Sequence, residues 1–443
     1  MALARVSRSG VRRWTRAALL TVGILIAFPL WTPQEAHALP RMSLTAGSPC
    51  ATCHVSPSGG GMRNELGFTS MNKVATLNFG DMGLDAAHHQ ETNQLFELIS
   101  VGADVRYQGV RLGVPTPDGQ GGTATPEFEM FWMQMQPYVA LHPTDWLTLS
   151  ASYSFDEGLW ADDDDTACQD TWPGMSCYTA EVVAAPSPDL PTVRAGMIVP
   201  SIGIRHDDHT ILSRSHGQRQ PLVPTNYAEL GGELSYQPIS WLRADVGVYD
   251  ATNLDDLLNG SSTTADIGDM AYLGRLQWLP QKRFTFGGEE EGDGFDDFDD
   301  FDAEPKTPTS FTLNGWLGAS VFASGDYRLE HYFAGVGSDF GATLQAELSR
   351  SSRTAEIPMT ELEITTQTVS VMASYAFWDW LVANARAEVG DADFNGTTFA
   401  TTQYVAGLEW FPLPFVEVRP EYRYVETDAF KFGQSTVQLH LFY

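Results

Sequence analysis

The segment ELSYQPISWLRADVGVYD, residues 233–250, has the pattern that decides the fold. In its second half Ala244, Val246 and Val248 alternate with a second set of side chains that begins with Asp245. Successive side chains of a β-strand point to opposite faces, so one face can meet lipid while the other lines a wet interior. A proline and a tryptophan interrupt the alternation in the middle of the segment, and this interruption predicts the tight turn of a β-hairpin.

Three further segments, residues 136–155, 370–390 and 405–426, repeat this layout with Pro or Trp-Asp in a very short turn. Short turns on one side, long polar loops on the other and aromatic residues near the rims are typical of a bacterial transmembrane β-barrel. A soluble β-sandwich is the alternative. The C-terminal residues VQLHLFY, 437–443, favour the barrel, because they alternate and end on an aromatic residue, like the terminal strand that outer-membrane assembly machinery recognises.

The segments between turn signals predict sixteen antiparallel strands, with fourteen and eighteen as alternatives. An even count returns the C-terminus to the side on which the N-terminal segment lies. The predicted strands start near Leu95, Glu127, Trp146, Tyr178, Thr192, Tyr227, Trp241, Ile267, Phe311, Tyr327, Gly341, Thr365, Trp380, Thr398, Phe415 and Gly433. We therefore predict an all-β protein, in which residues 95–443 form a barrel in contact with the lipid of the bacterial outer membrane.

Residues 1–38 have the features of a cleaved export signal. Five arginines precede the apolar stretch AALLTVGILIAFPLW, and Ala36-His37-Ala38 forms an A-x-A cleavage site. An uncleaved membrane anchor is the alternative, but a membrane span needs about 20 apolar residues. We therefore predict export of the mature chain.

Acidic residues dominate the charge of the chain, whose net value of −30 argues against nucleic acid as a partner and favours cations or basic proteins. Ten of the sixteen residues in EEEGDGFDDFDDFDAE, 289–304, are acidic. We predict that residues 289–309 form a disordered periplasmic insertion between the eighth and ninth strands. The alternative is a landing site for a basic periplasmic protein, or for hard cations that prefer carboxylate oxygens.

The four cysteines form two local pairs in a chain predicted to enter an oxidising compartment. Cys168 and Cys177 lie in a polar loop and predict a disulfide. Cys50, Cys53 and His54 instead have the C-x-x-C-H spacing of covalent haem attachment. In that chemistry the two thiols add across the two vinyl groups of one haem, and the adjacent histidine becomes an axial ligand of the iron. A zinc or redox C-x-x-C is the alternative, but zinc needs further ligands nearby and a thioredoxin-like motif needs a βαβ unit.

The predicted haem-binding segment, residues 39–94, is short and contains loop sequence such as SPSGGG, residues 56–61. We do not expect so short a segment to keep water away from a haem by itself. The barrel then supplies the missing pocket, with the segment acting as a plug in the lumen or at its periplasmic mouth.

The order of these features resembles that of the fused monohaem c-type cytochrome–porins of the bacterial outer membrane, a group that includes outer-membrane iron oxidases. The shared features are an export signal, the start ALPRMS at residues 38–43, one C-x-x-C-H motif and a porin-sized barrel. The resemblance implies that Cys50 and Cys53 attach the haem and that His54 is its proximal ligand. Iron-oxidase members carry aromatic-Ala-Arg before the cysteines and Phe-Pro-x-Leu after the histidine, whereas this chain has Arg-Met-Ser and residues 55–67, VSPSGGGMRNELG.

The sequence leaves the sixth ligand of the haem iron open. Met62 is the nearest sulfur, and Met71 and Met82 are further thioether candidates. The adjacent pair His88 and His89 would give bis-histidine ligation instead. A methionine ligand raises the haem potential relative to a histidine ligand.

A second group of metal-binding residue types lies in VPSIGIRHDDHTILSRSHGQRQ, residues 199–220. His206 and His209 flank two aspartates, and imidazole with carboxylate suits a divalent transition metal such as iron. The alternative is a polar loop that folds into the lumen and pairs with nearby arginines. Those arginines are Arg205, Arg214 and Arg219.

These features predict outer-membrane electron transfer through one covalently attached haem c. The haem would link an extracellular redox donor or acceptor, with iron among the candidates, to a periplasmic electron carrier such as a small cytochrome. Enzyme activity is left open; if present, it is that of a haem-dependent oxidoreductase such as a ferrous-iron oxidase. The alternative function is a diffusion porin whose haem plug is structural or a redox-sensitive gate.

Overall fold

The computed structural model describes most of the chain from residue 40 onward. The described residues are 40–71, 74–77, 92–96, 98–112, 128–155, 177–187, 189–206, 208, 210–214, 222–259, 264–265, 267–286, 309–357, 360–428 and 431–443. Their helical elements are α2 (Pro40–Ala46), η1 (Cys50–Thr52), α3 (Glu65–Met71), η3 (Leu212–Arg214) and α6 (Thr252–Asn259). Within this part of the chain, no helix has the length and apolar character that a membrane crossing requires. The predicted signal lies outside the described residues.

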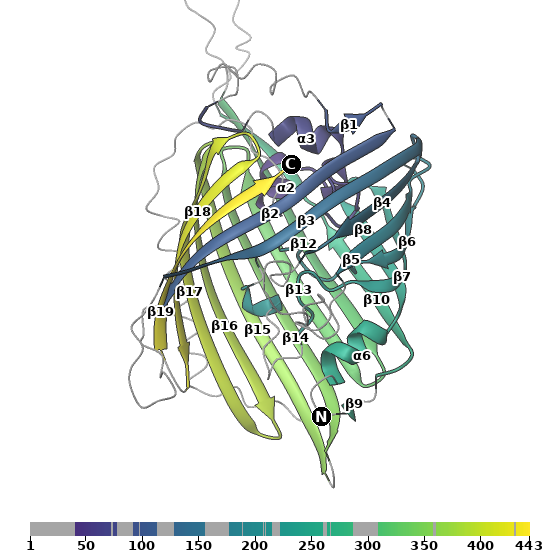
Figure 1. Ribbon diagram of the computed structural model, residues 1–443, viewed down its shortest axis with the longest axis vertical. Coiled ribbons are helices and arrows are strands. Elements are labelled where there is room, and N and C mark those ends of the chain that lie inside the picture. The colour runs from purple at the N-terminus through teal and green to yellow at the C-terminus, as the bar shows by residue number, and fades with distance from the viewer. Residues whose placement is uncertain are drawn as a thin grey trace, which may run out of the picture.

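Sixteen antiparallel strands form the wall of one closed barrel, which confirms the predicted fold (Figure 1). The wall strands are β2 (Ile99–Leu112), β3 (Phe128–Thr144), β4 (Leu147–Tyr153), β5 (Tyr178–Ala184), β6 (Thr192–Ile198), β7 (Glu229–Ile239), β8 (Leu242–Asp250), β10 (Met270–Trp278), β12 (Thr309–Ser324), β13 (Tyr327–Ser338), β14 (Ala342–Ile357), β15 (Thr360–Trp378), β16 (Leu381–Phe394), β17 (Thr397–Leu413), β18 (Val416–Thr427) and β19 (Lys431–Phe442). The ring closes where β19 pairs with β2. Every predicted strand start lies within about five residues of the observed one.

Three short strands accompany the wall. β1 (Gln94–Leu95) pairs with β2, and β9 (Thr264–Ala265) pairs with β14. β11 (Gln281–Phe286) continues β10 along the same neighbour, β12, in an unbroken register. A Leu279-Pro280 step separates the two pieces, and proline cannot donate to a strand ladder. β10 and β11 therefore act as one long strand.

The side chains of the wall alternate between the two faces as the sequence predicts. In β19, Val437 is exposed outside the barrel, whereas Gln438 and His440 are buried on the inner side. In β8, Val246 is 54% exposed and its neighbour Asp245 is fully buried. The outer surface is therefore apolar and the interior polar, which is the arrangement that a barrel in lipid requires. The protein is a β-barrel of the bacterial outer membrane.

The end of the barrel that holds the C-terminus carries tight turns, as predicted. These turns lie at residues 145–146, 240–241, 379–380 and 414–415. The opposite end holds the long connection between β6 and β7, at residues 199–228. Whereas the sequence predicted long polar loops there, this end also has tight turns. One of them uses Asn395 and Gly396 with φ of 48° and 88°, the positive values that a two-residue turn between twisted strands favours.

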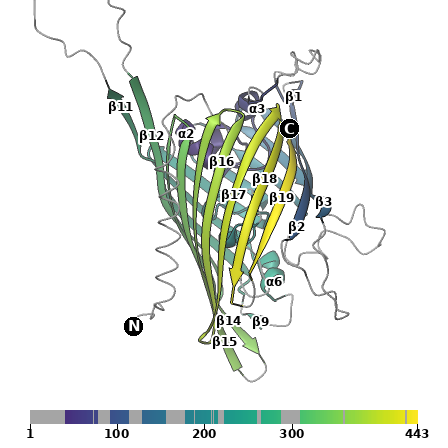
Figure 2. The ribbon, with the colours of Figure 1, turned by 90° about the vertical axis from the view of Figure 1, so that its left-hand side faces the viewer.

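The predicted acidic insertion, residues 289–309, lies outside the described residues except for Thr309, which belongs to β12. β11 and β12 flank it and project beyond the rim at the end where the C-terminus lies (Figure 2). In the second cysteine pair, Cys177 is disulfide-bonded, and its predicted partner Cys168 lies outside the described residues.

The N-terminal residues 40–71 lie at the same end of the barrel as the C-terminus (Figure 1). Leu44 of α2 packs with Trp316 and Phe333 of the wall. Phe68 of α3 packs with aromatic residues of the last strands and stacks on Phe415 at 4.7 Å. This segment, which we call the plug, is therefore held by apolar contacts to the inner wall.

The described residues of the connection between β6 and β7, which are 199–206, 208, 210–214 and 222–228, fold into the barrel from the other end, and we call them the lumen loop. Leu222 and Tyr227 of this loop join a buried apolar cluster with Phe322 of β12 and with Leu254 of α6. The plug and the lumen loop thus enter the same interior from opposite ends.

Candidate functional site

The C-x-x-C-H motif lies in the plug and begins with η1. The amide nitrogens of Cys53 and His54 both donate to the carbonyl oxygen of Cys50, at 3.1 and 3.0 Å. In a 3₁₀ turn the side chains at i and i+3 eclipse each other, so both sulfur atoms lie on one side of the chain. Both cysteines are free thiols.

A short hairpin follows the motif and folds back beside it. His54 forms an antiparallel bridge with Arg63, and the amide of Val55 donates to the carbonyl of Met62 at 3.1 Å. The connecting turn contains three successive glycines whose φ angles lie between 62° and 83°. Only glycine adopts this left-handed region without a steric penalty, so the sequence GGG fits the turn.

The glycine turn touches both the motif and the lumen loop. A Cβ placed on Gly59 would lie 3.1 Å from Cβ and 3.3 Å from Sγ of Cys50. A Cβ placed on Gly60 would lie 2.5 Å from Nε of Arg205. The turn therefore fits between Cys50 and Arg205 because it carries no side chains.

The motif lines a cavity of about 270 Å³ inside the barrel. Cys50, Cys53 and His54 of the plug line it together with Arg205 of the lumen loop and Tyr138 of β3. Plug, loop and wall must all be in place before this cavity exists.

The groups at the cavity fit a covalently attached haem c. Two free thiols and one imidazole line it, and Nδ1 of His54 is buried with no hydrogen-bond partner among the described residues. Burial, with Arg63 and Arg205, lowers the pKa of the His54 imidazole to about 3. The ring is therefore neutral at physiological pH, which is the form that binds a metal.

The candidates for the sixth iron ligand lie in different places. Met62 also lines the cavity, and a Cβ placed on Gly102 of β2 would lie 3.3 Å from its sulfur. Met71 packs in the aromatic cluster around Phe68. The other candidates lie outside the described residues: Met82, His88 and His89. The identity of the sixth ligand stays a prediction.

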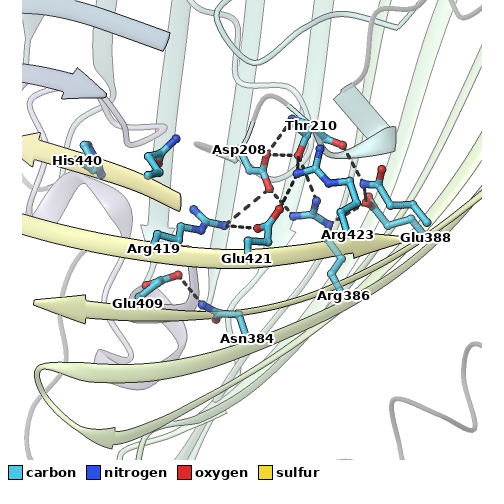
Figure 3. Close-up of polar contacts among 12 residues, drawn as sticks. Asp208, Thr210, Asn384, Arg386, Glu388, Glu409, Arg419, Glu421, Arg423 and His440 are labelled. Carbon is cyan, nitrogen blue, oxygen red and sulfur yellow. Dashed lines mark hydrogen bonds and ion pairs between the residues drawn. The ribbon is translucent and has the colours of Figure 1, made fainter. Parts of the chain in front are cut away.

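Asp208 connects the lumen loop to β16 and β18 of the wall (Figure 3). Its Oδ2 accepts a hydrogen bond from Nη1 of Arg386 at 2.6 Å and lies 3.7 Å from Nη2 of Arg419. Its Oδ1 accepts a bond from the amide of Thr210 at 2.8 Å. Burial alone would raise the pKa of the Asp208 carboxyl, but Arg386 and Arg419 hold it well below its ordinary value. The loop is thereby fixed across the lumen.

His206 of the lumen loop pairs with a carboxylate of the wall. Its Nε2 lies 3.1 Å from Oε2 of Glu347 on β14, whose Oε1 lies 2.8 Å from Nδ1 of His331. Over the described ranges, no group of three or more His, Cys, Asp or Glu side chains is arranged to hold a metal ion. His209 lies outside these ranges, so metal binding by His206 and His209 stays a prediction.

The lumen loop folds into the barrel, as the alternative interpretation of its sequence predicts, but with other partners. Arg214 donates to the carbonyl oxygens of Ile202 and Ile204 within the loop itself. The loop carboxylate Asp208 pairs with arginines of the wall instead of loop arginines. Arg219 lies outside the described residues.

Two kinds of site residue escaped the sequence analysis. Arg63 directly follows the glycine turn and Met62, and its proximity to the motif could have drawn attention to it. The wall arginines near Asp208 belong to a polar series at every second position of β18. That series is Glu417, Arg419, Glu421 and Arg423. Residues at every second position of a strand lie on one face, so this series predicts a polar face that lines the lumen.

No protein-family model and no curated protein matches this chain. Solved structures that match include the outer-membrane channel DcaP of Acinetobacter baumannii, 10% identical over 79% of this chain and 99% of that chain, with a TM-score of 0.48. An anion-selective porin from Comamonas acidovorans matches at 12% identity over 78% and 98%, with a TM-score of 0.44. A BenF-like porin from Pseudomonas fluorescens Pf-5 matches at 11% identity over 78% and 98%, with a TM-score of 0.41. None of these three descriptions concerns a cytochrome or an iron oxidase.

Proposed function

We propose that this porin-like barrel carries one covalent haem c in its plug and transfers electrons across the outer membrane. The observation that supports the proposal most directly is that Cys50, Cys53 and His54 line one cavity to which plug, loop and wall all contribute residues. A free-standing segment of this length would lack the lining that the loop and the wall contribute. The barrel therefore contributes the walls that a small cytochrome would build from its own helices.

Each element of the chain has a role in this proposal. A bound haem c supplies a one-electron redox couple at its iron. Cys50 and Cys53 anchor it, and the neutral imidazole of His54 is its proximal ligand. The wall and the lumen loop would cover part of the haem surface, and the Asp208–Arg386 pair holds the loop in that position. The plug lies at the end predicted to be periplasmic, where a small carrier would exchange electrons with it.

The proposal of a redox partner at the end opposite to the plug rests on the position of the lumen loop and not on a sequence motif. The lumen loop joins β6 to β7 at the end opposite to the plug, where an extracellular donor or acceptor would arrive. Ferrous iron is one candidate donor, in line with the resemblance to fused cytochrome–porins. In that case the protein acts as a haem-dependent oxidoreductase.

A second candidate function is a diffusion channel for small solutes. The porin-like architecture and the polar interior of the wall support this alternative. Charged side chains such as Arg386 and Glu388 face one another there at 2.8 Å and would be in the path of a solute. In this reading the plug is structural or gates the channel.

The test begins with the mass and the redox-titrated visible spectrum of the full mature chain in detergent. We expect a covalent c-type haem that Cys50→Ser with Cys53→Ser abolishes and that Ser56→Ala with Ser58→Ala, a control substitution in the same segment, retains. Rapid reduction of the haem by Fe(II) would support an inward iron-oxidising route. Reduction by a small periplasmic cytochrome alone would support outward electron flow. Absence of covalent haem contradicts the proposal, and solute flux into liposomes would then favour the channel.

A further inference from the structure

The cavity beside the C-x-x-C-H motif has an excess of positive charge. Five arginines line it: Arg63, Arg106, Arg194, Arg205 and Arg275. The carboxylates that line it, among the described residues, are Asp104 and Glu181. A buried charge without a partner is costly, so each of these cations needs to be accounted for.

Three of the five arginines are neutralised by carboxylates of the barrel wall. The pairs are Arg106 with Asp104 at 3.1 Å, Arg194 with Glu233 at 2.9 Å and Arg275 with Asp245 at 2.9 Å. Oδ1 of Asp104 also lies 3.0 Å from Nε2 of His440, and Oε2 of Glu181 lies 3.7 Å from Nη1 of Arg194. The carboxylates near the cavity are therefore already engaged.

Arg63 and Arg205 differ, because neither forms an ion pair with any described residue. Nη1 of Arg63 donates to the carbonyl of Phe442 at 3.3 Å, while its Nε is buried with no partner in the described chain. Arg205 lies against Gly60. Burial, with Arg194, lowers the pKa of Arg205 to about 10, so this guanidinium is still a cation at neutral pH.

The two unpaired arginines reach the same cavity from different elements, one from the plug and one from the lumen loop. We propose that Arg63 and Arg205 bind the two carboxylates of one dianionic ligand in this cavity. A guanidinium has the planar fork that matches a carboxylate, and such charge-assisted bonds are among the stronger ones in proteins. In the haem-loaded protein, an assignment that rests on the function proposed above, these carboxylates are the propionates of the covalent haem. A free dicarboxylate in the lumen has the same chemistry.

The first arm of the test uses the full chain after haem attachment, with Arg63→Gln, Arg205→Gln and the double variant. We expect each variant to keep its covalent haem, because the thiols are intact. The midpoint potential should fall, since a cation near the haem favours the reduced state, and it should fall further in the double variant. It should also become more dependent on pH, because carboxylates released from guanidinium take up protons more readily.

The matched control is Arg275→Gln, which also removes a cavity arginine. Asp245 keeps Arg243 at 2.8 Å in this variant, so the pH dependence of the potential should equal that of the parent chain. A double variant with the potential and pH dependence of the parent would overturn the inference for the haem-loaded protein.

The second arm separates the two sources of carboxylates and uses the haem-free full chain with Cys50→Ser and Cys53→Ser. Calorimetric titration with succinate, and with acetate for comparison, measures binding of a free dianion. Succinate binding that weakens by about tenfold or more in Arg63→Gln or Arg205→Gln supports the arginine pair as a dicarboxylate site. If the parent chain carries no haem and binds no succinate, both the proposed function and this inference fail. Succinate binding without haem in the parent would refute only the proposed function.

Discussion

Asp208 and Arg386 are 178 residues apart in the sequence, yet Oδ2 of the first and Nη1 of the second lie 2.6 Å apart inside the barrel (Figure 3). One belongs to the lumen loop and the other to β16. Arg386 also donates from Nε to Glu388 at 2.8 Å, so it connects a wall carboxylate to the loop. The position of the loop within the lumen is therefore set by charge pairing as well as by apolar contacts.

Loss of this pair should release the lumen loop. We expect Asp208→Asn to leave Arg386 and Arg419 without the loop carboxylate, at a cost on the order of 3 kcal/mol for a buried pair. Hydrogen exchange at the amides of Thr210 and Leu212 should accelerate, while strand amides stay protected. The exposed carboxylate of Asp339, changed to Asn, is the control. Equal exchange in both variants would show that Asp208 does not hold the loop.

Acid should have the same effect as this substitution. The pKa of Asp208 is held below its ordinary value of 3.8 by arginines, so its contribution to stability is present above that value. The contribution is lost as the pH falls through the lowered pKa of the folded state. We expect loop exchange in the parent chain to rise below about pH 4, and Asp208→Asn to lack this step. A step of the same size in both chains would assign it to other carboxylates.

The glycine turn offers a comparison between two residues with almost the same backbone angle. Gly59 has φ of 83° and lies against Cys50, whereas Gly396 has φ of 88° and no atom within 4 Å of its added Cβ. Both alanine variants should lose about 1–2 kcal/mol from left-handed strain. Only Gly59→Ala should also lower the yield of covalent haem, as measured by the mass of the mature chain. Equal yields would mean that the turn does not shape the attachment site.

Glu347 is the shared partner of several buried groups, and its removal should destabilise the barrel. His206, His331, Ser213 and the amide of Ile204 all contact its carboxylate within 3.1 Å. We expect Glu347→Ala to cost about 3–5 kcal/mol and Glu347→Gln distinctly less. Urea unfolding in detergent micelles measures the difference. Glu330→Ala, which removes a pair with the exposed Arg328, should cost less than about 1 kcal/mol.

The lipid-facing surface can be tested with two equally exposed residues. Val246 at the middle of β8 and Leu230 near the start of β7 are both 54% exposed. Arginine at the middle of the bilayer costs about 2–4 kcal/mol, and near the interface about 0–1 kcal/mol. We therefore expect Val246→Arg to lower stability in lipid vesicles far more than Leu230→Arg. Similar losses would contradict the proposed depth of β8 in the membrane.

The wall of the barrel was predictable because each strand carries its own evidence. The alternation of apolar and polar residues around Val246 and along VQLHLFY indicates which face of a strand meets lipid, and turn residues indicate where each strand ends. The broken strand β10–β11 was counted as one for the same reason. Local signals of this kind fix strand number and register without knowledge of distant contacts.

The interior was less predictable, because its contacts join segments that are far apart in the sequence. The spacing of Cys50, Cys53 and His54 was visible, but nothing local indicated that Arg205 would lie beside Gly60. The partner of Asp208 was likewise misjudged, since the nearest arginines in sequence are not the nearest in space. Which charges pair inside a barrel depends on which inward-facing side chains of different strands lie at the same height along the barrel axis.

The end of the chain bears on the plug as well as on the wall. The carbonyl of Tyr443 accepts a hydrogen bond from the amide of Ala103 at 2.9 Å. The ring of Tyr443 lies 5.1 Å from the ring of Phe68, and the carbonyl of Phe442 accepts a hydrogen bond from Nη1 of Arg63. Phe442 and Tyr443 therefore support the plug, in addition to the pairing of β19 with β2 that closes the barrel. Removal of residues 442–443 should therefore disturb the closure of the barrel and the position of the plug together, so one small deletion produces two separable defects.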